Sequence, residues 1–234
     1  MTKCADVYKK FFKPGEVVEI RAYGLNRSNK TWEGWAGGVG IVFGYFDNAE
    51  AFGAAAEALD VAGAHGVYFT INPCKPDLLA RAANRLKAAT QKSISTSDHD
   101  ILCIRWLPID LDPRRPAGIS STDAELSMAL EMRGEIIKWM KDEFKLLWPI
   151  QACSGNGAHL IYRAPDLDNN EKNKLIIKHC LHALAEAFPA GPVEVDLTVF
   201  NPARIWKVYG TMARKGDNTP DRPWRKSYLE EGEI

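Results

Sequence analysis

One stretch of the sequence decides the fold: Ile101-Leu-Cys-Ile-Arg-Trp-Leu-Pro-Ile-Asp-Leu-Asp112. Residues 101–111 form an apolar run without helical flanks, a pattern that predicts a strand buried at the centre of a sheet. The strand ends in Asp110 and Asp112. Residues i and i+2 of a strand face the same side of the sheet, with Cα atoms about 6.5–7 Å apart. We therefore expect the two carboxylates to lie side by side at the end of a central strand, where α/β proteins tend to place their sites.

Strands and helices are mixed along the rest of the chain. Alternating or β-branched residues predict strands over 16–23, 35–46, 66–73 and 193–200, with two shorter strands between 149 and 163. Helical periodicity and capping residues predict helices over 48–62, 76–89, 122–147 and 168–188. Because the two kinds of element alternate rather than segregate, the expected fold class is α/β, or α+β, with a central sheet.

Composition places the chain among globular proteins. Of its 234 residues 46% are hydrophobic, and no apolar run approaches the ~18 residues that span a bilayer, so we expect no membrane partner. The N-terminal residues lack the apolar core of a signal peptide, and five scattered cysteines without a Cys-x-x-Cys pair favour reduced thiols, hence a cytoplasmic protein. Thirty Lys and Arg balance thirty Asp and Glu, so a site for a polyanion requires local clustering of charge.

Paired carboxylates on one sheet face can bind divalent ions. Two-metal sites for phosphoryl transfer hold their ions about 3.5–4 Å apart, and carboxylates bridge them. The sequence has three Asp-x-Asp pairs, at 98/100, 110/112 and 166/168, and a turn or a helix cap is the ordinary explanation for any one of them taken alone. Only the pair at 110/112 ends a strongly apolar strand, where carboxylates are costly to bury unless they are paired or bind a metal. Asp196, in another apolar segment, can complete a site of three carboxylates.

A glycine loop, Ser154-Gly-Asn-Gly-Ala-His159, is the second candidate for chemistry. Two glycines let backbone N–H groups approach an anion closely, and the strand that follows holds His159 at the exit of the loop. A histidine held there can donate a hydrogen bond to a phosphate oxygen. The alternative is a plain glycine turn with a histidine that is satisfied in the core.

Residues 201–228 carry a local net charge of +5 in a neutral chain, because seven Lys and Arg stand against two Asp. Trp206, Tyr209 and Trp224 lie among these cations, and Arg114 and Arg115 add positive charge beside the Asp pair. Basic side chains interleaved with aromatic rings suit phosphates and unstacked bases. The alternative for this tail is a solvated loop. The seven basic residues are Arg204, Lys207, Arg214, Lys215, Arg222, Arg225 and Lys226.

In this order, the motifs resemble those of the archaeo-eukaryotic primase superfamily, in particular the primase-polymerase domains of plasmids, phages and CRISPR-associated proteins. Asp110 and Asp112 match the first motif and Val195-Asp196 the third. The second motif is matched by Ser154, Gly155, Gly157 and His159. The resemblance covers about residues 60–228, with further matching flanks at 112–116, 120–125, 201–204, 209–211 and 215–217. It departs at Arg222-Pro-Trp-Arg225, where a different aromatic residue or a histidine is expected in place of Trp224.

The resemblance implies a single catalytic domain, with an N-terminal α/β module over 1–100 and an RRM-like catalytic module over 101–228. The chain ends at Glu230-Glu-Gly-Glu-Ile234 without a cap signal, from which we expect a domain cut from a longer protein. The implied activity is template-directed transfer of nucleotides from (d)NTPs on single-stranded DNA, onto a primer strand or onto a first nucleotide. Helicase or CRISPR adaptation proteins are the partners expected through regions outside this chain.

The resemblance also implies a role for each matched residue. Asp110, Asp112 and Asp196 would bind two Mg²⁺ or Mn²⁺ ions, without an organic cofactor. The incoming triphosphate would be held by Ser154, Gly155, Asn156, Gly157 and His159, and phosphates would be contacted by Arg204, Lys207 and Lys215.

Two other functions fit the same residues. A non-catalytic module could bind single-stranded nucleic acid through residues 201–228, and salt-sensitive binding without metal-dependent incorporation of nucleotides would favour it. A metal-dependent phosphohydrolase could use the same carboxylates, and release of pyrophosphate only in the presence of template would exclude it.

Overall fold

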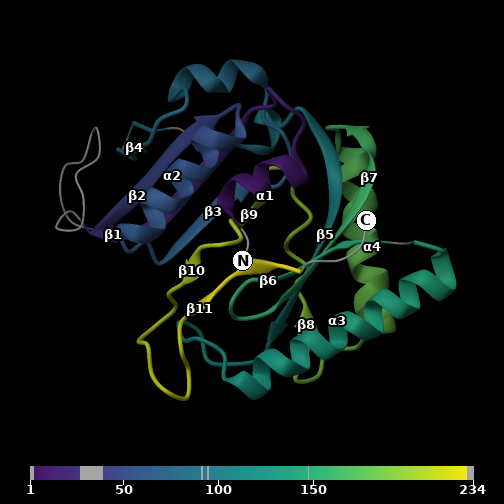
Figure 1. The fold of residues 1–234 in the computed structure, drawn as a ribbon. Coiled ribbons are helices and arrows are strands. Elements are labelled where there is room, and N and C mark those ends of the chain that lie inside the picture. The colour runs from purple at the N-terminus through teal and green to yellow at the C-terminus, as the bar shows by residue number, and fades with distance from the viewer. Residues whose placement is uncertain (1–2, 27–38, 91, 94, 147, 231–234) are drawn as a thin grey trace.

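The computed structural model describes residues 3–26, 39–90, 92–93, 95–146 and 148–230 (Figure 1). Within these ranges the strands form two five-stranded antiparallel sheets and a separate two-stranded ribbon. Helices pack on both sheets, which confirms the mixed α/β fold class expected from the sequence. No helix in these ranges is long and apolar enough to cross a membrane.

The first sheet has the strand order β4 (Lys87–Ala88), β2 (Val39–Phe46), β1 (Val18–Asn26), β3 (Gly66–Thr70), β9 (Ile205–Lys207). Helices α1 (Cys4–Phe11) and α2 (Ala49–Val61) pack on one face of it, where rings of both helices contact Phe69. The Asn48 side chain caps α2 by accepting the backbone N–H of Ala51, as expected for a helix start. Since successive residues of a strand face opposite sides, Tyr68 of β3 points away from the helices.

The predicted helix over 76–89 is wrong. Pro76–Arg81 forms only a short 3-10 helix, and Lys87–Ala88 is strand β4. The backbone of Tyr45 at the end of β2 donates to Ala82 and accepts from Asn84, which has a left-handed φ of 48°. These bonds to a neighbouring strand replace the bonds that would have continued the helix. The sequence patterns also gave no prediction for α1.

The second sheet has the strand order β12 (Tyr228–Leu229), β6 (Ile150–Cys153), β7 (Ala158–Asp168), β5 (Cys103–Pro113), β8 (Val193–Val195). Helix α3 (Asp123–Phe144) joins β5 to β6, and α4 (Glu171–Ala187) joins β7 to β8. The four strands β5 to β8 with these two helices thus have the β-α-β-β-α-β order of ferredoxin-like and RRM sheets, with β5 near the centre as predicted. The capping box predicted from Thr122 and Glu125 is present at the start of α3.

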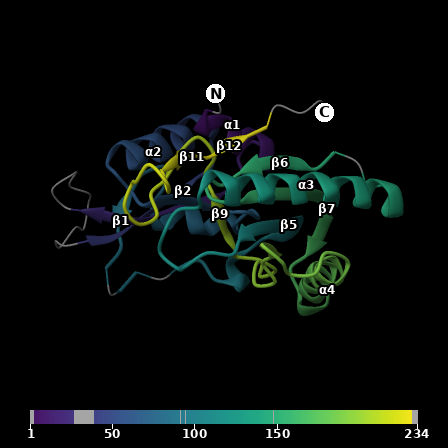
Figure 2. The same ribbon diagram turned by 90° about the horizontal axis from the view of Figure 1, so that it is seen from below.

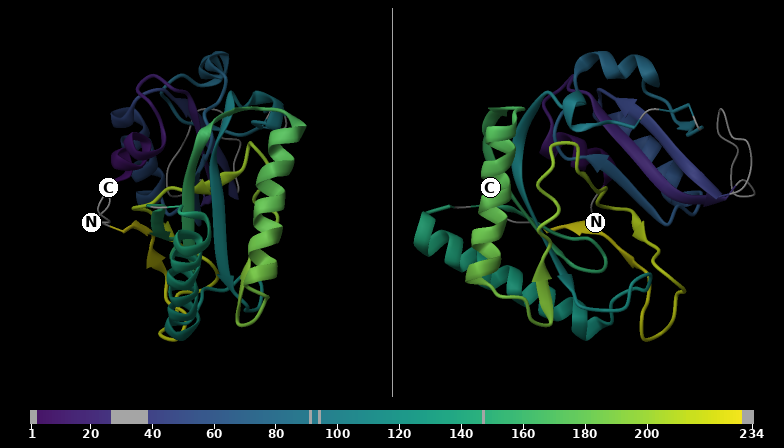
Figure 3. Two further views of the ribbon diagram at one scale, coloured as in Figure 1. Left: turned by 90° about the vertical axis from the view of Figure 1, so that its right-hand side faces the viewer. Right: turned by 180° about the vertical axis from the view of Figure 1, so that it is seen from behind.

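The two sheets share one hydrophobic core, in which the ring of Phe11 from α1 lies 5.2 Å from that of Trp106 on β5. Figure 2 shows α1 and α2 on one side of the molecule and α4 on the other. The boundary expected at residue 100 does not separate the sheets, because β9 from the C-terminal part pairs with β3 of the first sheet. In Figure 3 this C-terminal segment, yellow-green to yellow, runs through the middle of the molecule and continues into the ribbon of β10 (Met212–Ala213) and β11 (Arg225–Lys226).

A buried ionic cluster also joins the two parts of the fold. The guanidinium of Arg105, whose side chain is 3% exposed, binds the carboxylates of Glu16 before β1 and Asp166 on β7. Both oxygens of Glu16 lie within 2.6 Å of Arg105, and Lys13 and Arg163 bind Asp166 from the surface. The guanidinium therefore holds the pKa of both carboxyl groups below their ordinary values.

Candidate active site

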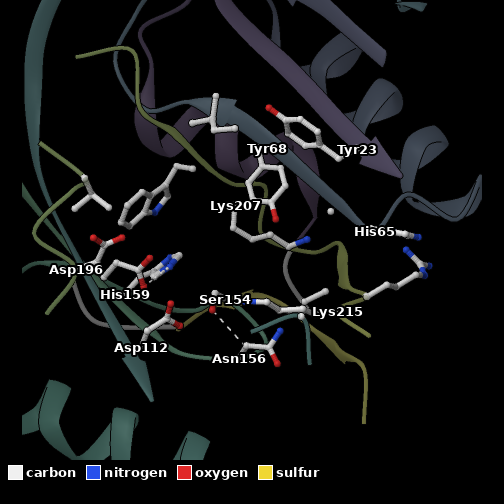
Figure 4. Close-up of a pocket in the computed structure, with 18 of the residues that line it drawn as sticks. Tyr23, His65, Tyr68, Asp112, Ser154, Asn156, His159, Asp196, Lys207 and Lys215 are labelled. Carbon is white, nitrogen blue, oxygen red and sulfur yellow. Dashed lines mark hydrogen bonds and ion pairs between the residues drawn. The ribbon is translucent and has the colours of Figure 1, made fainter. Parts of the chain in front are cut away.

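A cavity of about 620 Å³ lies between the two sheets and is lined by residues from both. Its walls come from β1, β3 and β9 of the first sheet and from β5 and β7 of the second, with loops from both halves of the chain. Most of the residues predicted from the sequence line it: Asp110, Asp112, Ser154, Asn156, His159, Asp196, Arg204, Lys207 and Lys215. Figure 4 shows Asp112, His159 and Asp196 at one end of the cavity and Tyr23 and His65 toward the other.

The pairing of the second sheet brings the three predicted carboxylates onto one face. Asp110 of β5 pairs with His159 of β7 on one side. On the other side Leu111 pairs with Val195, and the N–H of Asp196 donates to the Asp110 carbonyl over 2.9 Å. Side chains of directly opposed residues lie on the same face of a sheet. Asp196 is therefore beside Asp110, and Asp112 is two residues further along the same face.

The predicted strand over 193–200 ends early, and this early end shapes the site. The carboxylate of Asp196 accepts the backbone N–H of Thr198 over 2.7 Å, which forms a tight turn directly after β8. Arg204 donates from its guanidinium to the carbonyl oxygen of Thr198. Arg204 lines the cavity, but in this structure it supports the turn that carries Asp196.

The Asp pair concentrates negative charge that the protein offsets only in part. Partial burial and the neighbouring Asp110 raise the pKa of Asp112, while Arg115, Lys215 and His159 act in the opposite direction. Arg115 is itself fixed by the carbonyl oxygens of Pro113 and Ile119, at 2.9 and 3.2 Å, and its guanidinium lies 3.5 Å from Asp112 Oδ1. A cation bound beside Asp112 would relieve the remaining repulsion.

The donor chemistry fits Mg²⁺ or Mn²⁺, because these ions prefer carboxylate oxygens. Within the described residues no three His, Cys, Asp or Glu side chains are already gathered around one point. Asp110 instead contacts His159 at 3.3 Å, Asp112 contacts Arg115, and Asp196 binds within its own turn. Because the three carboxylates share a face of the sheet, they would have to rotate about their side-chain bonds to bind one ion together.

The glycine loop does not offer free backbone amides. The Ser154 hydroxyl accepts the N–H groups of Asn156 and Gly157 over 3.3 and 2.9 Å, and the N–H of Gly155 lies 3.3 Å from Cys153 Sγ. The predicted anion cradle of Ser154 and the 155–157 backbone is therefore satisfied within its own loop. Gly155 and Gly157 do not line the cavity, whereas the side chain of Asn156 does.

The glycines of this loop are explained by packing. A Cβ at Gly157 would lie 2.5 Å from the carbonyl oxygen of Leu111 and 3.0 Å from Asp112 Oδ1. Gly155 has a φ of +99°, a conformation that L side chains rarely adopt. The loop thus presses against the end of β5, and Asn156 accepts the backbone N–H of Ser121 over 2.9 Å, which ties the loop to the start of α3.

Most arginines of the basic tail are paired inside the protein. Arg214 binds Asp60 at 2.8 Å, Arg222 binds Glu125 at 2.9 Å, and Arg225 binds Asp123 at 2.6 Å. Lys215 lines the cavity and pairs with no carboxylate in the part of the chain that the structure describes. The local charge of +5 is therefore largely neutralised on folding.

Lys207 is an almost fully buried cation in the wall of the cavity. Its ammonium donates to the carbonyl oxygen of Met212 over 2.8 Å and lies 5.6 Å from the centre of the Tyr68 ring. Burial lowers the pKa of Lys207 to about 7, partly offset by Asp60. This amine therefore changes its charge near neutral pH.

Three cavity residues had no sequence signal: Tyr23, His65 and Tyr68. Tyr23 and Tyr68 lie on neighbouring strands β1 and β3, with their rings 5.9 Å apart in an edge-to-face pair. They resemble ordinary strand tyrosines in the sequence. Only the pairing of the strands shows that they form one aromatic stretch of the cavity wall.

The sequence matches no protein-family model and no curated protein. Among solved structures it is similar to the polymerase domain from Mycobacterium tuberculosis Ligase D, which was solved in complex with DNA. The TM-score is 0.47 and the identity 16%, over 96% of this chain and 78% of that chain.

Proposed function

We propose that the protein is a DNA primase-polymerase that transfers nucleotides from (d)NTPs to a growing strand on a single-stranded template. One observation carries the proposal: Asp110, Asp112 and Asp196 lie on one face of a sheet, at one end of a cavity of about 620 Å³. Pockets that bind small molecules usually have volumes of about 300–1,000 Å³. The cavity therefore has the volume of an ordinary ligand pocket.

The order of groups along the cavity suits a nucleoside triphosphate. Carboxylates occupy one end, where divalent ions and the reacting phosphate belong. Lys207 and Lys215 follow, and they offer positive charge to phosphate oxygens. The Tyr68 ring lies beside Lys207, and Tyr23 continues this aromatic surface away from the carboxylates, so that a base can pack against it.

The chemistry needs no covalent nucleophile. Bound Mg²⁺ or Mn²⁺ would activate the attacking hydroxyl and neutralise charge on the triphosphate. The protein's own groups would bind and orient: the three carboxylates would hold the ions, and Lys215, whose charge acts on Asp112, would meet phosphate oxygens. Arg115 fixes the segment after β5. In such a reaction, positioning and charge neutralisation supply most of the rate enhancement.

The test is synthesis on single-stranded DNA, with and without a primer, for each nucleotide set and each metal. We expect metal-dependent incorporation with a primer, and products without a primer if the enzyme also initiates strands. The variant Asp110→Asn/Asp112→Asn should lose incorporation, whereas Asp142→Asn should keep it, since Asp142 is an exposed carboxylate on α3 that does not line the cavity.

The same assay separates the alternatives. Incorporation by Asp110→Asn/Asp112→Asn at the wild-type rate would refute the metal assignment. Salt-sensitive binding of single-stranded DNA without any incorporation would identify a binding module. Hydrolysis of nucleotides without template would identify a phosphohydrolase.

A further inference from the structure

Three side chains form a hydrogen-bonded chain whose last member, His159, contacts the candidate metal ligand Asp110. Trp206 Nε1 donates to Tyr209 Oη over 2.7 Å, and Tyr209 Oη lies 2.7 Å from His159 Nδ1. His159 Nε2 lies 3.3 Å from Asp110 Oδ1. Trp206 is on β9 of the first sheet, while His159 and Asp110 face each other on β7 and β5 of the second. The chain therefore connects the two sheets at the site.

The chemistry of the donors fixes the direction of this chain. An indole N–H can only donate, so the Tyr209 oxygen accepts from Trp206. Tyr209 is fully buried, and among the described residues its oxygen has only Trp206 and His159 as partners. Its own proton must therefore go to His159 Nδ1, because a buried hydroxyl is almost always satisfied. A neutral histidine that accepts at Nδ1 carries its proton at Nε2.

Packing holds the imidazole in this orientation. The ring of Trp206 lies over that of His159, with centroids 4.3 Å apart, and Tyr209 contacts it edge-to-face at 5.8 Å. The side chain of His159 is only 5% exposed. The ring is thus enclosed by the two residues that form the rest of the chain.

We propose that Tyr209, oriented by Trp206, is a positioning residue that fixes His159 in the tautomer with its proton on Nε2. His159 then presents an N–H on the side that contacts Asp110. What this donor achieves rests on the proposed function: it orients the Asp110 carboxylate for a metal ion, as outer hydrogen bonds do for metal ligands in general. The tautomer itself does not depend on the proposed function.

Asp110 alone could favour the same tautomer, because a carboxylate accepts from Nε2. The test therefore uses Asp110→Asn, which keeps the shape but can either accept or donate. The ring nitrogens of His159 are followed by ¹⁵N NMR at a pH where the imidazole is neutral, and the His159→Gln spectrum assigns their signals among the five histidines. We expect the proton to stay on Nε2 in Asp110→Asn and to distribute over both nitrogens in Asp110→Asn/Tyr209→Phe.

Trp206→Phe is a second variant that tests the same proposal if Tyr209→Phe does not fold. Trp206→Phe removes the indole donor but leaves an aromatic ring, so Tyr209 becomes free to accept from Nδ1. Combined with Asp110→Asn, it should also increase the form protonated on Nδ1. A proton on Nδ1 in Asp110→Asn, or an unchanged preference for Nε2 in both double variants with native-like spectra, would overturn the proposal.

Metal binding supplies a separate readout. In an otherwise wild-type protein, Tyr209→Phe should weaken the affinity for Mn²⁺, measured by calorimetry, about 10- to 100-fold, the range for loss of outer hydrogen bonds at metal ligands. His159→Gln, which keeps an N–H near the position of Nε2, should weaken it less than His159→Ala. Equal affinity in wild type and Tyr209→Phe would show that the tautomer does not act on the metal site. If no metal binds at all, the proposed function fails, while the tautomer measurement still stands.

Discussion

Asp196 lies directly across the strand pair from Asp110, with its backbone N–H 2.9 Å from the Asp110 carbonyl oxygen. The neighbouring pair of Leu111 and Val195 continues the same register. A slip of one residue would move Asp196 to the other face of the sheet, among apolar side chains. The position of the third carboxylate is therefore set by strand pairing rather than by a flexible loop.

Replacing Asp196 by Asn should abolish the metal-dependent reaction without unfolding the turn. Asn keeps the Oδ1 that accepts the N–H of Thr198, so the backbone after β8 should stay in place. Loss of outer partners of a metal site already costs about 10- to 100-fold, so loss of a ligand should cost at least about 100-fold in incorporation and in Mn²⁺ affinity. Incorporation rates and calorimetry with the Asp142→Asn control check this, and near-normal values would remove Asp196 from the site.

Replacing Arg105 by Met should destabilise the protein at neutral pH by about 3–5 kcal/mol, because it leaves Glu16 and Asp166 without their buried partner. Urea unfolding of both proteins across pH measures the effect. The two carboxyl groups have lowered pKa values in the folded protein, so their contribution is present above about pH 4 and is lost as the pH falls through the folded pKa. The difference between wild type and Arg105→Met should therefore shrink in acid, and a difference that is constant from pH 7 to pH 3 would contradict the assignment.

Two glycine-to-alanine substitutions should have opposite effects. Gly157→Ala places a Cβ 2.5 Å from the Leu111 carbonyl, so it should lower both stability and incorporation by displacing the end of β5. Gly134→Ala, inside α3, meets nothing within 4 Å and should raise stability by about 0.5–1 kcal/mol. Thermal unfolding of both variants checks the signs, and a neutral Gly157→Ala would show that the loop does not press on β5 in solution.

Lys207→Met should raise the free energy of unfolding and lower incorporation, because it removes a buried amine from the wall of the cavity. Because burial lowers the pKa of Lys207 to about 7, the unfolded chain binds its proton more tightly than the folded chain. The stability of the wild type should then rise between about pH 7 and pH 10, where the unfolded state alone keeps the proton. Lys207→Met removes the charge, so its advantage in unfolding free energy should be largest below pH 7 and fade toward pH 10. A pH-independent difference would show that the amine is charged in the folded protein.

Features that depend on local sequence could be predicted. The apolar run over residues 101–111 gave the strand with Asp110 and Asp112 at its end, and Thr122 with Glu125 gave the start of α3. Both signals come from residues a few positions apart, where backbone periodicity and capping chemistry act directly.

Features that depend on pairing between distant segments could not be predicted. Tyr23 and Tyr68 share a stretch of the cavity wall only because β1 and β3 pair in a particular register. The serine and glycines at 154–157 have the composition of an anion loop, yet the Ser154 hydroxyl satisfies the amides itself. Arg214, Arg222 and Arg225 had the spacing of a nucleic-acid patch, but each finds a carboxylate from far away in the chain. A sequence pattern lists donors and acceptors, whereas folding decides which of them meet.

The return of β9 to the first sheet has a consequence for biosynthesis. The ribosome completes the first four strands of that sheet early, but their last neighbour is not translated until Ile205–Lys207. Until then β3 exposes an unpaired edge, and such edges invite association with other chains. A nascent chain whose first sheet forms before Ile205–Lys207 is translated would carry this open edge, and the cavity is complete only once β9 has joined the sheet.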